Sequence, residues 1–251
     1  MTERQNKVKP TRKLAPIQLS YVYLLIIINF PVCLGGYLLY RLGYPILLLG
    51  IMLCIWLSIG HAGSFDQTGL LLFRDEQGHL LGPEWVSVIT RDITALGSNW
   101  ILLFGMAVMS LVFTLRRHYL QAIELLVMAL GGVFFSMGAK YLFERPRPDL
   151  VPHLIEVYTP SFPSGHATMS MVCFLGGALV ISKMWSERSA RRTLVAAAVL
   201  SSLMVGISRV MLGVHWPSDV LAGWLLGILW VLLVHQYCSH YRLNSTGLSS
   251  C

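Results

Sequence analysis

The sequence predicts an all-α, polytopic membrane protein: a bundle of six membrane-spanning helices preceded by an extra N-terminal apolar segment. Hydrophobic residues make up 55% of the chain and charged residues only 12%, whereas a soluble domain carries roughly 25% charge. Apolar stretches of spanning length, about 17 to 25 residues, recur along the chain, and the charged residues gather in the loops between them. The bilayer is therefore the predicted solvent, and no separate soluble domain is expected.

The predicted elements follow from the apolar stretches, which fall at residues 19–40, 43–60, 98–115, 119–140, 163–183, 194–212 and 217–236. The first stretch is interrupted by Pro31 and Gly35-Gly36, so it is either a span or an interfacial or re-entrant segment. The predicted organisation is a basic tail at 1–18, the extra apolar segment at 19–42, a six-span domain at 43–236 and a C-terminal tail at 237–251.

Loop charges predict the orientation, because Lys and Arg are enriched in cytoplasmic loops. Basic residues crowd two loops, at Arg116-Arg117 and between Lys183 and Arg192, and both loops are predicted to be cytoplasmic. The segment 61–97 is mainly acidic and is predicted to be external. The basic N-terminal tail argues for a cytoplasmic start, which conflicts with two full spans before residue 61, so the topology of residues 1–42 stays open.

The external segment 61–97 also contains apolar runs. Leu70-Leu-Leu-Phe73 and Glu84-Trp-Val-Ser-Val-Ile89 are apolar enough to lie on the surface and line an entrance for lipid. The alternative is that the segment is an inert connector.

The first of three polar strings contains Lys140 and Arg147-Pro148, at the end of an apolar stretch. Proline rings at 146 and 148 prevent the helix from continuing, and the two cations at this point suit phosphate binding, arginine through its planar fork. The alternative is that both side chains simply reach for the membrane interface. Glu144, Arg145 and Asp149 flank the string without a readable role.

The second string is Pro163-Ser164-Gly165-His166, directly before an apolar stretch. Unpaired N–H groups and the positive end of the helix dipole make a helix start an anion site, and Gly165 lets a phosphate oxygen approach the backbone. His166 is then placed to donate a proton. A capping turn with an incidental histidine explains the same pattern.

The third string is Ser208-Arg209, followed by His215 and Asp219. His215 and Asp219 are one helical turn apart and share a face if a helix begins here, and a carboxylate beside an imidazole fixes its tautomer. Such an imidazole is a candidate nucleophile, and Arg209 adds a third cation. Asp219 as a simple helix cap is the alternative.

Together the three strings resemble the signature of the type 2 phosphatidic acid phosphatase (PAP2) superfamily. The resemblance covers roughly residues 43–236, and the linking residues look most like small bacterial members that act on phosphatidylglycerophosphate or undecaprenyl pyrophosphate. The family core is similar to six spans, so the apolar segment before residue 43 is a departure. The signature positions present are Lys140, Arg147, Pro148, Pro163, Ser164, Gly165, His166, Ser208, Arg209, His215 and Asp219.

The resemblance implies a lipid phosphatase in which His215 attacks phosphorus, Asp219 holds the imidazole, and His166 protonates the leaving oxygen and then activates water. Phosphoryl oxygens are bound by Lys140, Arg147, Ser164, Gly165 and Arg209. The resemblance also implies metal independence; the chain shows no carboxylate cage for magnesium, and its cysteines have no metal-ligand spacing, so no cofactor or metal is expected.

The predicted location is the cell (inner or plasma) membrane, multi-pass, with the site on the non-cytoplasmic face. The predicted partners are the bilayer and a lipid phosphate or pyrophosphate, with no nucleic acid; the lipid and the oligomeric state stay open. Three alternatives remain: a lipid phosphotransferase using the same covalent intermediate, a non-enzymatic lipid or anion carrier, and a vanadium haloperoxidase. The carrier does not need the His215–Asp219 pair, and haloperoxidases resemble larger soluble proteins.

Overall fold

The computed structural model describes residues 43–56 and 63–245, and all regular elements among them are helical. The predicted basic tail 1–18 and extra apolar segment 19–42 lie outside the described residues, so neither prediction is tested. The chain divides into two units, Met1–Ile46 and Leu47–Cys251. Of the first unit, the structure describes only residues 43–46, which begin the apolar helix Gly43–Trp56; the helices that follow it belong to the second unit.

Helices occur at all six predicted core positions. After Gly43–Trp56 come α4 (Asn99–Leu115), α5 (Tyr119–Phe143), α8 (Arg188–Met211) and α9 (Pro217–Ser245). Between α5 and α8, one continuous helix Gly165–Ser182 consists of α6 (Gly165–Ser170), a π-helical turn η1 (Met171–Leu175) and α7 (Gly176–Ser182). The predicted fold class, an all-α membrane protein, is confirmed.

Length and hydropathy distinguish these helices as candidate spans. Among the described residues, four meet both criteria alone: α5, the helix Gly165–Ser182, α8, and α9 over Pro217–Ser239. α4 meets them when joined to the preceding α3 (Glu84–Ala95), from which it is bent by 43°. The helix Gly43–Trp56 is apolar but shorter.

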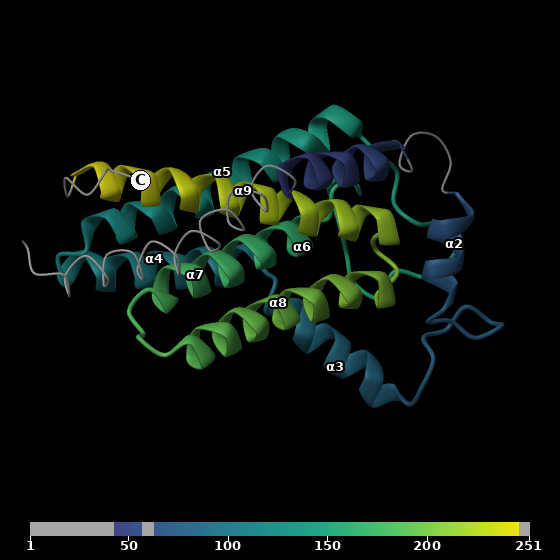
Figure 1. The fold of residues 1–251 in the computed structure, drawn as a ribbon. Coiled ribbons are helices and arrows are strands. Elements are labelled where there is room, and N and C mark those ends of the chain that lie inside the picture. Colours follow the sequence, from purple (N-terminus) through teal and green to yellow (C-terminus); the bar gives the residue numbers. More distant parts are fainter. Residues whose placement is uncertain (1–42, 57–62, 246–251) are drawn as a thin grey trace, which may run out of the picture. The chain divides into compact units, whose positions relative to one another are not determined.

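The core lies where the helix Gly165–Ser182 is surrounded by its neighbours. Figure 1 shows α5 and α9 running along it on one side and α8 on the other, and all three contact it. Fully buried side chains fill these contacts, among them Leu125, Met128, Met169, Val172 and Val231. The outer surfaces of α4 and α5 instead expose large apolar side chains such as Trp100, Phe104, Leu130 and Phe134, as lipid-facing surfaces do.

The contact between α6 and α9 depends on two glycines four residues apart. A Cβ at Gly223 would lie 2.8 Å from the Ser164 carbonyl oxygen, and one at Gly227 would lie 2.9 Å from the Thr168 carbonyl oxygen. Small residues at this spacing allow helix backbones to approach closely in membranes. The second polar string, at the start of α6, is thereby held against the third, at the start of α9.

The described part of the segment 61–97, residues 63–97, is partly helical and partly buried, which corrects one prediction. Leu70, on α2 (Ser64–Leu71), is fully buried in a cluster with Val210 and Trp216 and is not on the surface, although Leu71 and Leu72 are exposed. α2 packs on α8 and α9 because its apolar side covers the turn that joins them. The segment is therefore more than an inert connector.

α3 is consistent with the surface part of the same prediction. It packs on α8 through a buried face that includes Thr94 and exposes Trp85, Val88 and Ile89 on the other. An apolar face of this kind suits an interfacial position. Whether lipid enters here remains a prediction.

Candidate active site

The three polar strings meet at one end of the bundle because each lies at a helix end. α5 ends at Phe143, before the two prolines, and brings Lys140 with it. α6 and α9 begin here, and α8 ends here. Between these ends lies a cavity of about 390 Å³. Six of the eight predicted site residues line it: Lys140, Arg147, Gly165, His166, Arg209 and His215.

His215 lies in the turn between α8 and α9 with its ring almost fully buried. Its Nδ1 is 3.5 Å from Asp219 Oδ2 and 3.3 Å from Ser161 Oγ. Its Nε2 is 3.3 Å from Arg147 Nη1, and since a guanidinium only donates, Nε2 is the acceptor. The contacts therefore select the tautomer with the proton on Nδ1 and the lone pair on Nε2.

The surroundings of His215 also favour the neutral ring. Burial, followed by the positive charges of Arg209 and Arg147, lowers the pKa of His215 well below its usual value of about 6.5. A neutral imidazole has the lone pair that a nucleophile needs.

Asp219 does not line the cavity but lies behind His215, fully buried. Its Oδ2 accepts hydrogen bonds from Ser161 Oγ at 2.5 Å and from the Trp216 amide at 2.9 Å. The second bond is a local one at the start of α9, where Pro217 suits the first helical position. The same carboxylate therefore caps the helix and faces the imidazole, so the two interpretations of Asp219 are compatible.

Main-chain carbonyl groups orient two of the three predicted cations, Lys140 and Arg147. Lys140 Nζ donates to the Pro160 carbonyl at 2.6 Å. Arg147 donates from Nε to the Thr159 carbonyl at 2.8 Å and from Nη1 to the Val214 carbonyl at 2.6 Å. These carbonyls orient the cations while leaving their charge uncancelled.

Arg209 is held less completely. Its Nη1 donates to Thr94 Oγ1 at 3.1 Å, on α3. Its Nε is buried and has no hydrogen-bond partner among the described residues. The same holds for Asn99 Oδ1, which belongs to another cavity-lining residue. An orphaned buried donor at a cavity wall is a natural contact for an anion.

Ser164 is the one predicted phosphate ligand that the structure places away from the cavity wall. It is fully buried and is the N-cap of α6, where its hydroxyl accepts the Ala167 amide at 3.5 Å. Its own amide donates to the Asp219 carbonyl at 2.9 Å. Gly165 and His166, the next two residues, line the cavity.

Three site-associated residues were missed by the sequence analysis: Ser161, Arg145 and Asp66. Ser161 hydrogen-bonds Asp219, as described above. Arg145 Nη1 lies 2.5 Å from Asp219 Oδ1, and its Nη2 lies 2.7 Å from Asp66 Oδ2. All three are buried. Arg145 follows Glu144 and precedes Pro146, a local pattern that carries no signal of its own, and Asp66 is one of several acids in the segment 61–97 that was predicted to be external.

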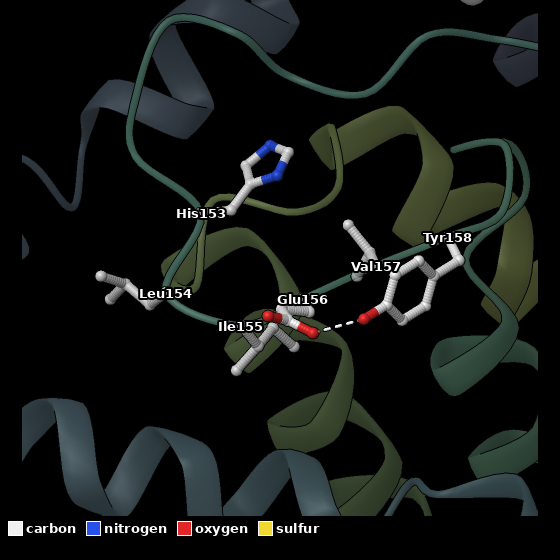
Figure 2. Close-up of a pocket in the computed structure, with 6 residues that line it drawn as sticks. All are labelled: His153, Leu154, Ile155, Glu156, Val157 and Tyr158. Carbon is white, nitrogen blue, oxygen red and sulfur yellow. Dashed lines mark hydrogen bonds between the residues drawn. The ribbon is translucent and has the colours of Figure 1, made fainter.

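The loop between α5 and α6 forms part of the cavity wall through residues 155–159. Figure 2 shows the adjoining stretch, which surrounds a hollow of about 420 Å³, with Glu156 directed at Tyr158 and His153 turned away from both. The hydrogen bond from the Tyr158 hydroxyl to Glu156 raises the pKa of that tyrosine. The loop thus places an acid and a phenol at the cavity.

No group of three or more potential metal ligands occurs among the residues that the structure describes. Three cations, Lys140, Arg147 and Arg209, and one acid, Glu156, line the cavity, and this excess of positive charge favours direct binding of an anion.

Comparisons with known proteins agree on one family. A model described as the PAP2 superfamily matches residues 99–242. The chain is 32% identical to phosphatidylglycerophosphatase B of Bacillus subtilis over 162 residues, which are 63% of this chain and 78% of that protein. It is 29% identical to undecaprenyl-diphosphatase of Sulfolobus acidocaldarius over 127 residues, 48% of this chain and 56% of that protein.

A solved structure shows the same fold. The crystal structure of a transmembrane PAP2 type phosphatidylglycerolphosphate phosphatase from Bacillus subtilis matches with a TM-score of 0.67 and 27% identity. The match covers 77% of this chain and 94% of the other.

Proposed function

We propose a function from one premise: the chain belongs to the PAP2 superfamily, and it is a multi-pass membrane lipid phosphatase of that metal-independent class. We infer that it hydrolyses a phosphomonoester or pyrophosphate of a membrane lipid through a phosphohistidine intermediate. The substrate classes are phosphatidylglycerophosphate, undecaprenyl pyrophosphate and phosphatidic acid, and the relatives named above support the first two.

The observation that carries this proposal is the setting of His215. Its Nε2 lies beside Arg147 at the cavity, and its Nδ1 faces a buried carboxylate. A nucleophile oriented by a second group and adjacent to cations is the arrangement required for covalent catalysis on a phosphate. A carrier needs the cations alone.

In the first half-reaction, the lone pair of His215 Nε2 attacks phosphorus in line with the lipid oxygen. The N–P bond forms as the P–O bond to the lipid breaks, and His166 gives a proton to the departing oxygen. The imidazole gains positive charge, which Asp219 stabilises through Nδ1–H. The products of this step are the dephosphorylated lipid and a phosphorylated His215.

In the second half-reaction, His166 accepts a proton from a water molecule as the water oxygen attacks phosphorus. The N–P bond breaks, inorganic phosphate leaves, and His215 is neutral again. A single residue acting as acid and then as base returns to its starting state after each cycle.

Phosphoryl oxygens are bound by Lys140, Arg147, Arg209 and the Gly165 amide, with Ser164 shaping the amide site as the N-cap of α6. Because carbonyl groups already orient Lys140 and Arg147, little reorganisation accompanies charge development at phosphorus. Removing one such donor typically costs about 2.7–4 kcal/mol in the barrier.

The site suits a lipid because it lies at helix ends. A phosphate at headgroup depth is reached without moving its chain into water, which costs about 0.8 kcal/mol for each exposed methylene. By the loop charges described above, this end is proposed to face the non-cytoplasmic side of the cell membrane.

Phosphate release from a panel of lipid phosphates and pyrophosphates in detergent tests the proposal. The wild-type protein should release phosphate from at least one, and His215→Ala should lower the rate at least about 10³-fold, as loss of a nucleophile does. His79→Ala, which changes an exposed histidine, should match the wild type. A folded His215→Ala protein that retains turnover would contradict the mechanism.

The same panel with an added acceptor lipid separates hydrolysis from transfer. The proposal predicts that inorganic phosphate forms at the same rate with and without acceptor. Phosphorylated acceptor in place of inorganic phosphate would identify a phosphotransferase.

A further inference from the structure

The buried network behind the catalytic pair has Arg145 at its centre. Its two terminal nitrogens reach two different carboxylates: Nη1 to Asp219 Oδ1 at 2.5 Å and Nη2 to Asp66 Oδ2 at 2.7 Å. Ser218 joins the same group, with its hydroxyl 2.8 Å from Arg145 Nη1 and 2.7 Å from Asp66 Oδ2. None of these residues lines the cavity, so none is placed to touch a substrate.

Asp66 has a second function in this network. Its Oδ1 accepts the Ser218 amide at 2.9 Å, in the first turn of α9, where amide groups have no partner within the helix. A residue of α2 therefore caps the helix that carries Asp219. With one carboxylate Asp66 both fixes the start of α9 and anchors Arg145.

The consequence for Asp219 is that its two oxygens have separate partners. Oδ1 is held by Arg145, while Oδ2 receives Ser161 and faces His215. If Arg145 were released, Oδ1 would lose this partner, and the orientation of the carboxylate toward the imidazole would depend on the Ser161 and Trp216 hydrogen bonds to Oδ2 alone.

Charge leads to the same conclusion. Two buried carboxylates share one guanidinium, so the group retains a net negative charge directly behind His215. Asp66 thereby prevents Arg145 from neutralising Asp219 completely. Since the imidazole becomes positive during phosphoryl transfer, this residual negative charge stabilises the reacting state more than the resting state.

We propose that Arg145 and Asp66 are positioning residues for the His215–Asp219 pair, and that α2 contributes to the reaction through them without reaching the substrate. This inference rests on the proposed function, in which His215 is the nucleophile.

Asp66→Asn is the sharpest variant, because asparagine keeps the size of the side chain and the oxygen that accepts the Ser218 amide. It removes the charge shared with Arg145 and replaces Oδ2, which accepts from Arg145 Nη2 and the Ser218 hydroxyl, with an NH₂ group that can only donate. The expected result is a kcat about tenfold lower, as for coupled residues of one network, with a KM within about twofold of the wild type. The matched control is Asp92→Asn, the same change at an exposed residue of the same segment, which should leave both constants unchanged.

Arg145→Lys supplies a second variant. Lysine keeps the charge but has no planar fork with which to hold two carboxylates in fixed directions. It should lower kcat in the same way while the protein remains folded.

A double variant distinguishes a positioning role of Asp66 from a simple loss of folded protein. If Asp66 acts through Asp219, adding Asp66→Asn to Asp219→Asn should lower kcat by less than about twofold, because the interaction is already lost. A further tenfold loss in that background would overturn the proposal, as would an Asp66→Asn protein with wild-type kcat.

Nuclear magnetic resonance of protein labelled with ¹⁵N-histidine gives a readout that needs no substrate. The His215 signals, assigned by their absence in His215→Ala, should report the Nδ1–H tautomer in the wild type. Asp66→Asn and Arg145→Lys should both shift them, and unchanged His215 signals in both would refute the positioning role. If the wild type releases no phosphate from any lipid, the proposed function fails. The spectra still show whether Asp66 and Arg145 position the His215 ring.

Discussion

At the scale of single residues, the environment of His215 sets the pH range in which the proposed nucleophile is neutral. The ring is buried among cations that a phosphate substrate is expected to neutralise. Before substrate binds, burial first and those cations second keep the ring free of a proton by lowering its pKa, and the substrate brings negative charge that compensates the cations.

The pH dependence of kcat/KM tests this point, because it reports the groups of the free enzyme. A group with a lowered pKa loses its proton at lower pH, so neutral His215 persists below pH 6.5 and activity is lost only as the pH falls through the lowered pKa. The acid limb of the profile should therefore lie well below 6.5. An acid limb at or above that value, measured with a substrate whose own ionisation is constant, would contradict the assignment.

The cations make a second prediction, on metal removal. Three positive side chains can bind the phosphoryl oxygens without a divalent ion, so excess chelator should leave the release rate unchanged within about twofold. The rate is measured before and after dialysis against chelator. Strong inhibition that magnesium reverses would contradict the proposed site.

Residues with a local signature were accessible from the sequence, and residues defined by tertiary contacts were not. His215 and Asp219 are four positions apart, so helical geometry alone predicts their contact. Asp66 and Arg145 are 79 positions apart, and nothing local distinguishes either from a surface charge. Ser164 was predicted to face the phosphate because a helix start binds anions, yet in the structure its hydroxyl is used to cap that helix.

At the scale of elements, the close contact of α6 with α9 holds the proposed acid–base residue near the nucleophile. His166 is in the first turn of α6, and Asp219 is in the first turn of α9. The two helix starts are linked by the hydrogen bond from the Ser164 amide to the Asp219 carbonyl. Their separation therefore depends on how closely the two backbones pack.

Gly227→Ala should disturb this packing. The added Cβ would lie 2.9 Å from both the Thr168 carbonyl oxygen and Met171 Cβ, so the helices must separate. A loss of about 1–3 kcal/mol of stability is expected from such overpacking, together with a lower kcat. Thermal unfolding in detergent and the release assay measure the two effects.

Gly138→Ala is the matched control, since a Cβ at this exposed position of α5 meets nothing within 4 Å. Alanine is a better helix former than glycine by about 0.8–1.0 kcal/mol, so this variant should be as stable as the wild type or more so. Equal behaviour of the two variants would show that the α6–α9 contact tolerates expansion.

Hydropathy was sufficient to predict the long apolar helices that are candidate spans, but not the helices α2 and α3 beside them. α4, α5, α8 and α9 each coincide largely with a long apolar stretch of the sequence. α2 and α3 mix polar and apolar residues, and their packing faces are defined only by the helices that they cover. The Gly223 and Gly227 spacing was available in the sequence, although it does not by itself identify α6 as the partner.

At the scale of the whole second unit, α5 joins two polar groups. Lys140 is near its C-terminal end at the cavity, and Glu124, sixteen residues earlier, is about 24 Å away along the helix. Glu124 is fully buried and lies 2.6 Å from His235 Nδ1, on α9. Nearby loops carry the basic residues that predict a cytoplasmic position, so the proposed site and these loops should be on opposite sides of the membrane.

Labelling of introduced cysteines in intact cells tests this orientation. Tyr158 is 88% exposed at the cavity end, and Ser186 is exposed in the loop between α7 and α8. A membrane-impermeant maleimide should label Tyr158→Cys in intact cells and Ser186→Cys only after permeabilisation, with the wild type as the background control. The reverse pattern would place the site on the cytoplasmic side.

The carbonyl groups that hold the cations have a consequence for how this chain tolerates change. Lys140 and Arg147 are oriented by main-chain oxygens of residues 159, 160 and 214, which every amino acid supplies. Substitutions at those positions preserve the acceptors as long as the path of the chain is kept. These three carbonyl contacts therefore place no demand on side-chain identity at residues 160 and 214, whereas at residue 159 the threonine hydroxyl also accepts from Arg147 Nη2; the chain can change at the first two positions while the cations stay in place.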